Sequence, residues 1–198
     1  MKETIEIFKK NHGYAYLKTL KKTGVHTDRV RTLVEKGIIE RVKPGLYKLV
    51  DMPAVAEQGM IDICMAMPRA VVCLHSALSY YDFTTTVPSF VMIALPRGSK
   101  PAKVTYPPFK VFHFAEKNYQ PGIEEVETES GVFRIYNPEK TLVDCFRYRN
   151  RLGEDVALEG LKNYLRSRKA KLSKLTGLAK EGRMFNVIKP YIEATIAV

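Results

Sequence analysis

The chain has few of the residue patterns that mark secreted or membrane proteins. It contains 3 cysteines, Cys64, Cys73 and Cys145, and none lies in a Cys-x-x-Cys pair. Their neighbours are apolar, so we expect buried, reduced thiols and a cytoplasmic protein. The longest uncharged run, Phe83 to Pro96, is too short and too polar for a membrane span. The first residues lack the apolar core of a signal peptide, so we expect no membrane association.

Common enzyme motifs are missing as well. The chain has no glycine-rich phosphate loop, no His-Glu-x-x-His and no Gly-x-Ser-x-Gly, and its 4 histidines are scattered. The best catalytic candidates are His75 and Ser76 with Asp82. Adjacent side chains on a helix point about 100° apart, however, so a hydrogen-bonding pair at a helix start is the favoured interpretation. We expect no enzymatic activity, no cofactor and no metal site.

Positive charge dominates what is present. The 198 residues carry a formal net charge of +11, and 45% of them are hydrophobic, which suffices for a packed core. Residues 1–50 hold 12 Lys and Arg against 5 Asp and Glu, and residues 147–183 hold 11 against 4. Between them, residues 51–146 are mildly acidic, with 8 against 11. Two basic blocks predict a polyanionic partner.

The first fifty residues have clear helix and hairpin signals. The expected elements are helices at residues 4–11, 15–22 and 28–36, then strands at 38–42 and 46–50. Thr27 is a plausible N-cap of the third helix, and Gly37 suits its left-handed end. This order is that of a winged helix-turn-helix. We therefore assign residues 1–52 to a DNA-binding domain and residues 53–198 to a second domain.

The third helix is expected to enter the major groove of double-stranded DNA, while the hairpin, or wing, contacts the backbone. The candidate groove residues are His26, Thr27, Arg29, Arg31 and Thr32. The candidate phosphate contacts on the wing are Arg41, Lys43 and Lys48. Arginine can donate two hydrogen bonds to guanine, so the helix should specify the sequence and the wing should anchor the protein.

The remainder of the chain mixes strands and helices. The expected helices lie at 54–67, 71–83, from Asn137, at 154–167, at 172–181 and in a last stretch that Pro190 kinks or splits; the expected strands lie at 90–95, 111–114, 122–128 and 131–136. Asp144 falls among apolar residues, which favours a satisfied buried carboxylate over a catalytic acid. The predicted fold class is α+β, with a winged helix-turn-helix followed by a mixed C-terminal domain ending in helices.

Three motifs resemble one protein family. They are Gly37–Tyr47 of the hairpin, His75–Leu78 with Pro88 downstream, and Pro138–Asp144. The chain resembles the AbiEi-type antitoxins of bacterial type IV toxin-antitoxin systems. The resemblance implies a repressor that binds inverted repeats in its own operon. It also implies an antitoxin that counteracts a nucleotidyltransferase toxin without a stable complex. Domains of this kind read two half-sites about 34 Å apart, so we expect a homodimer on DNA.

Other functions stay open from the sequence alone. One alternative is a nucleic-acid-processing or nucleotide-transferring enzyme that carries a winged helix for targeting. Another is a protein-interaction module with an incidental helix-turn-helix. The basic block 147–183 could serve the antitoxin role, extend the DNA footprint or bind RNA.

Overall fold

The computed structural model describes residues 2–53 and 55–196, and its fold is mixed α+β. The chain divides into two compact units. The first contains the residues up to Ala70, together with Lys100–Pro108 and Glu125–Phe133. The second contains Val71–Ser99, Phe109–Glu124 and the chain from Arg134 onward. The expected domain boundary after residue 52 lies inside the first unit.

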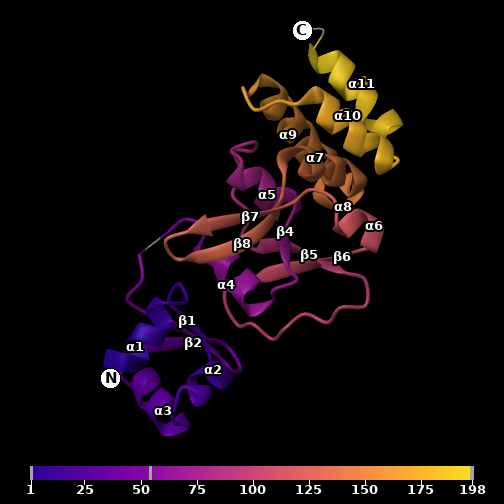
Figure 1. Ribbon diagram of the computed structural model, residues 1–198. Coiled ribbons are helices and arrows are strands. Elements are labelled where there is room, and N and C mark those ends of the chain that lie inside the picture. The colour runs from indigo at the N-terminus through magenta and orange to yellow at the C-terminus, as the bar shows by residue number, and fades with distance from the viewer. Residues whose placement is uncertain (1, 54, 197–198) are drawn as a thin grey trace. The chain divides into compact units, whose positions relative to one another are not determined.

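The first unit holds three helices, a small sheet and a fourth helix (Figure 1). Its elements are α1 Lys2–Lys9, β1 Tyr14–Tyr16, α2 Leu17–Lys22, α3 Thr27–Glu35, β2 Ile39–Lys43, β3 Leu46–Leu49 and α4 Gln58–Ala66. The sheet order is β1-β3-β2, and both pairings are antiparallel. The helix expected from residue 15 starts at Leu17, because the three residues before it pair with β3 as a strand.

The first unit has its own apolar core, to which the helices and the sheet contribute. Its buried members are Phe8, Ala15, Leu20, Val30, Leu33, Ile39 and Leu49. Two glycines shape the chain around this core. Gly37 ends α3 at a φ of +64°, and Gly45 turns the hairpin at a φ of +81°. Both are left-handed conformations that glycine adopts without a steric penalty, as predicted for the end of α3.

The second unit is built around a five-stranded sheet and a group of helices. Its elements are β4 Val71–Val72, α5 Leu74–Tyr80, β5 Val91–Pro96, β6 Phe109–Phe114, α6 Glu116–Tyr119, β7 Ile123–Thr128, β8 Gly131–Tyr136, α7 Pro138–Arg147, α8 Arg149–Leu152, α9 Glu154–Arg166, α10 Leu172–Glu181 and α11 Phe185–Ile196. The strand order is β6-β5-β4-β8-β7. The pairs β5–β6 and β4–β8 are parallel, whereas β4–β5 is antiparallel. The turn of the β7–β8 hairpin is grouped with the first unit.

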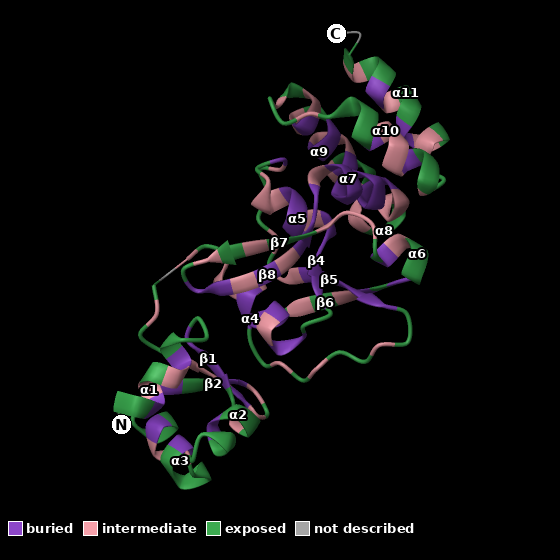
Figure 2. Cartoon of the chain, in the orientation of Figure 1, coloured by how far each residue is buried: buried purple, intermediate pink, exposed green. Residues whose placement is uncertain are grey.

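Helix α7 is the centre of the helical layer. It contacts α5, α9 and α10, and Figure 2 shows that nearly all of it is buried. Its start confirms the sequence prediction, since Pro138 is its first residue and the Asn137 side chain accepts a hydrogen bond from the Lys140 amide at 2.9 Å. Helix α11 runs unbroken through Pro190, so it is not split, at the loss of one backbone hydrogen bond.

Two expectations about composition are tested directly. Cys64, Cys73 and Cys145 are free and buried, as their apolar neighbours predict. Within the ranges 2–53 and 55–196, no helix combines the length and the apolarity that a bilayer crossing requires.

Candidate nucleic-acid interface

Helix α3 buries two apolar side chains and exposes its arginines, although Val34 is also 38% exposed. Val30 and Leu33 are 2% and 1% exposed and lie in the core of the first unit. Arg29 and Arg31 are exposed, and so are His26 and Thr27 at the start of the helix, as the green outer face of α3 in Figure 2 indicates. Four of the five predicted groove residues therefore face solvent.

The exposed α3 side chains differ in how firmly they are held. Arg31 Nε lies 2.9 Å from Glu35 Oε1, but the two side chains are 78% and 60% exposed. Because solvent screens this ion pair, exchanging Glu35 for another anion costs Arg31 little energy. The Thr32 hydroxyl donates to the Asp28 carbonyl at 2.9 Å, and Thr32 is only half-exposed. Thr32 is thus the least available of the five.

Two of the groove candidates border the same hollow. His26 and Arg29 line it together with the turn before α3 and one side of α1. Glu3 also lines this hollow and contributes a negative charge. The structure therefore brings His26 and Arg29 together at the beginning of α3.

The wing lysines occupy a different environment. Lys48 lies between Tyr14 and Glu40 in a row across the three strands. Its ammonium is 3.0 Å from Glu40 Oε1 and 2.7 Å from Asp62 Oδ2 of α4, and its side chain is 13% exposed. Burial alone would lower the pKa of Lys48, but the hydrogen bonds with Asp62 and Glu40 outweigh it and raise the pKa. The charge of Lys48 is thus fixed and already paired.

Asp62 collects several donors from the sheet and from its own helix. The Tyr14 hydroxyl donates to Asp62 Oδ1 at 2.5 Å, and the Gln58 amide donates to the same oxygen at 3.2 Å. With Lys48 on Oδ2, the carboxylate is saturated, although Asp62 is only 3% exposed. Burial, followed by the bond to Asp62, raises the pKa of Tyr14, so its hydroxyl remains a donor.

The other end of α4 is held in the same manner. Lys43 Nζ donates to the Ala66 carbonyl at 2.6 Å, where a cation is favoured by the dipole of the helix. The same ammonium lies 5.5 Å from the centre of the Tyr16 ring. The Tyr16 hydroxyl donates to the Met65 carbonyl at 2.8 Å. Polar contacts therefore tie both ends of α4 to the wing.

These contacts differ from the expectation that Lys43 and Lys48 bind phosphate. Sequence reasoning treated one face of the hairpin as open to solvent, whereas the contacts of α4 occupy it. Asp62, an acid inside the apolar run Ile61–Cys64, is the signal that could have indicated this docking. Arg41 is the wing candidate that stays exposed.

A second group of charges lies in the second unit. Lys140 and Asp144 form a hydrogen-bonded ion pair in which the side chains are 5% and 0% exposed. Lys140 Nζ also lies 4.4 Å from the centre of the Tyr136 ring. Burial raises the pKa of Asp144 and lowers that of Lys140, while each partner opposes the shift of the other. As expected from the sequence, Asp144 is a buried and paired carboxylate.

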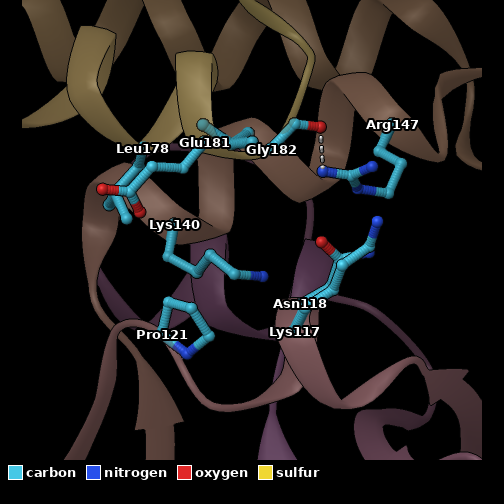
Figure 3. A pocket seen from close by; sticks show the side chains of 9 residues that line it. Lys117, Asn118, Pro121, Lys140, Arg147, Leu178, Glu181 and Gly182 are labelled. Carbon is cyan, nitrogen blue, oxygen red and sulfur yellow. Dashed lines mark hydrogen bonds between the residues drawn. The ribbon is translucent and has the colours of Figure 1, made fainter.

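A small pocket opens beside this pair (Figure 3). Lys140 points into it, and Arg147 lies across it with one guanidinium nitrogen donating to the Gly182 carbonyl at 2.8 Å. Arg147 Nε is 3.6 Å from Asp144 Oδ1, which is too long for a hydrogen bond. Glu181 adds a further carboxylate to the lining. Lys117 adds a third cation to the lining, and the pairing of Lys140 with Asp144 offsets part of this positive charge.

Ser76, one of the residues considered for catalysis, makes an ordinary structural contact, and so does Glu159 nearby in the second unit. The Ser76 hydroxyl accepts from the Met92 amide at 2.9 Å, which fixes the start of α5 against β5. Glu159, from α9, accepts from the Thr84 hydroxyl at 3.0 Å and from the Thr85 amide at 2.8 Å. In the part of the chain that the structure describes, no three His, Cys, Asp or Glu side chains gather as metal ligands would.

Comparisons with known proteins bear on the first unit most directly. Residues 2–50 match the model of a family described as "Transcriptional regulator, AbiEi antitoxin". The match confirms the resemblance for these residues and supports a role as a regulator. The markers at His75 and Pro138 lie outside the matched range. No curated protein matches the chain.

One solved structure resembles nearly the whole chain. It is the crystal structure of the RV2827C protein from Mycobacterium tuberculosis, with a TM-score of 0.59 over 96% of this chain and 79% of that one. The two sequences are 11% identical, so the likeness concerns the fold alone.

Proposed function

We propose that this chain is a DNA-binding transcriptional regulator whose N-terminal part is a winged helix-turn-helix. The observation that carries the proposal is the division of α3, which buries Val30 and Leu33 and leaves Arg29 and Arg31 in solvent, within the residues that match regulators. A helix that is anchored in a core by one face and exposes cations on the other has the geometry to enter a major groove.

Within α3, the proposed tasks follow from exposure. Arg29 and Arg31 are the residues for guanine O6 and N7, because a guanidinium forms two parallel hydrogen bonds to that edge. His26 and Thr27, at the start of the helix, are placed to contact neighbouring bases or phosphates. Thr32, whose hydroxyl bonds to Asp28, contributes least.

On the wing, we assign the backbone contact to Arg41. Lys43 and Lys48 serve instead to hold α4, because their ammonium groups bond to Ala66 and to Asp62. The DNA-binding module then extends to α4, beyond residue 52.

The regulator is proposed to act on its own operon and as an antitoxin. The match to a family described as a transcriptional regulator and antitoxin supports this by analogy. The inverted repeats and the opposing nucleotidyltransferase toxin are what the resemblance to AbiEi-type antitoxins implies. Binding to an inverted repeat requires two copies of α3 about 34 Å apart, so we propose a homodimer on DNA. The basic block 147–183 is available for the antitoxin role.

The test is a mobility shift with the region upstream of the gene and a scrambled duplex of equal length, over a series of salt concentrations. Wild-type protein should prefer the upstream duplex, and Arg29→Ala/Arg31→Ala should lose that preference. The matched control is Lys117→Ala/Lys189→Ala, which removes two exposed cations of the second unit outside the basic block 147–183. Equal affinity of the wild type for both duplexes would refute the proposal.

A further inference from the structure

A long segment without acidic residues follows β5. Between Phe83 and Ala115 the chain contains no Asp or Glu, and it carries four basic residues, Arg97, Lys100, Lys103 and Lys110. Residues 97–108, all of which the structure describes, form neither a helix nor a strand. Within Lys100–Pro108, both lysines are exposed and Tyr106 is 75% exposed. The exposed side chains of this segment therefore include two cations and a phenol, beside Pro101, Thr105 and Pro108.

The exposed side chains recur with a regular spacing. Lys100, Lys103 and Tyr106 are three residues apart, which is the period of a polyproline II helix. Pro101, between the two lysines, favours such an extended backbone. The more protected positions are Ala102, Val104 and Pro107. The segment thus has an inner side and an outer side, and the outer side carries the charge.

The inner side is held by the first unit. The Ala102 amide contacts Met67 Sδ, directly after α4, at 3.2 Å, and Pro107 is buried. Lys100–Pro108 is grouped with the unit that also contains α3. Because the backbone is already anchored, binding a partner on the outer side costs this segment little conformational entropy.

We propose that Lys100–Pro108 is a second DNA-contacting element, which binds the phosphate backbone of the duplex that α3 reads. This inference rests on the proposed function. Lys100 and Lys103 each neutralise a phosphate, and the Tyr106 hydroxyl donates to a phosphate oxygen. The element adds affinity without sequence preference, since no side chain on its outer side has the paired donors that read a base.

The first test removes the two charges with Lys100→Ala/Lys103→Ala in the full-length chain. The slope of log K against log salt should fall in magnitude by about 1.8, or about 0.9 for each phosphate contact. Upstream and scrambled duplexes should weaken equally, so their ratio is retained. The matched control is Lys117→Ala/Lys189→Ala, two exposed lysines of the second unit. An identical change of the salt slope in the control would show that the slope depends only on the net charge of the protein, and it would overturn the proposal.

The second test uses the absence of tryptophan from this sequence. Tyr106→Trp introduces a single reporter on the outer side of the segment. Saturating duplex should protect this tryptophan from quenching by acrylamide. If the variant binds DNA in a mobility shift and its tryptophan stays fully accessible, the second element is refuted while the proposed function stands.

Two further outcomes of the same titration are decisive. If no duplex binds at any salt concentration, the proposed function fails and the second element fails with it. If vesicles rich in anionic phospholipid protect the tryptophan and the duplex does not, the segment is a membrane contact and the proposal is wrong.

Discussion

Helices α3 and α7 both follow a polar N-cap residue, His26 and Asn137, and both mix charged with apolar side chains, but they differ in what covers them. In α3, the arginines face solvent, and only Val30 and Leu33 are buried. In α7, every residue from Glu139 to Phe146 is buried, including three charged ones. Helices α5, α9 and α10 pack closely on α7, so its charges must be paired within the protein.

The difference gives the two sets of charges different roles. Glu139 accepts from the Tyr164 hydroxyl at 2.9 Å and pairs with Lys174 at 3.1 Å, while Lys140 pairs with Asp144. Such groups specify how helices pack and are costly to disrupt. The α3 arginines contribute little to folding, since Arg29 lines an open hollow and the pair of Arg31 with Glu35 is exposed and screened by solvent. A charge in the sequence supports a binding role when it is exposed, and a structural role when it is buried and paired.

The largest effect on stability is expected in α7. Lys140→Ala leaves the Asp144 carboxylate, which is 0% exposed, with Arg147 at 3.6 Å as its remaining cation. Breaking a buried pair from one side costs about 3–5 kcal/mol, which urea unfolding followed by circular dichroism will measure. Lys140→Met/Asp144→Asn removes both charges and should recover part of the loss. If Lys140→Ala changed the free energy of unfolding by less than about 0.5 kcal/mol, the pair would stabilise the protein no more than an ordinary surface contact does.

A smaller effect separates two basic residues of one hairpin. Lys48→Ala leaves Asp62 without its cation and should lower the free energy of unfolding by about 1–3 kcal/mol, with an unchanged salt dependence of DNA binding. Arg41→Ala is the matched variant. It should reduce the salt slope by about 0.9 and leave stability within about 0.5 kcal/mol. If the salt slope of DNA binding changed in Lys48→Ala and not in Arg41→Ala, Lys48 would be the residue that contacts the phosphate backbone.

The smallest effect is a pH dependence of stability in the second unit. Burial lowers the pKa of His75, against the opposing influences of the Thr86 backbone and Glu159. The unfolded chain therefore binds a proton at His75 more readily than the folded chain does. The neutral form of His75 stabilises the folded chain above about pH 6.5, and this stabilisation is lost as the pH falls through the lower pKa of the folded state. The contribution should be small, since His75 is half-exposed and solvent screens its interactions. Wild type should lose more stability than His75→Gln between about pH 8 and about pH 5.5. Equal losses would assign the pH dependence to other groups.

Local signals in the sequence predicted much of the fold. The start of α7 depends on Asn137, Pro138 and an amide three residues onward, and the end of α3 depends on Gly37. Such features involve neighbours in the chain, so the residue types suffice to locate them. The strand β5 was also predicted, from its continuous apolar run.

Contacts between distant residues were harder to predict. β1 has three residues, and Tyr14 to Tyr16 form a strand because β3, more than thirty residues later, pairs with them. The position of α4 depends on Lys48 meeting Asp62 across 14 residues. For the same reason, the sequence did not predict that Lys43 and Lys48 contact α4, at Ala66 and Asp62. The exposure of Arg29 and Arg31 was predicted, because the apolar spacing of α3 determines which side is buried.

The central claim is that α3 reads bases through Arg29, and a double-mutant cycle tests it most directly. Guanines of the upstream duplex are replaced one at a time by 7-deazaguanine, which lacks the N7 acceptor, and wild type is compared with Arg29→Ala. The account predicts that at one guanine or more the replacement weakens the wild type by about 1–3 kcal/mol and weakens Arg29→Ala far less. Equal losses for both proteins at every guanine would contradict it.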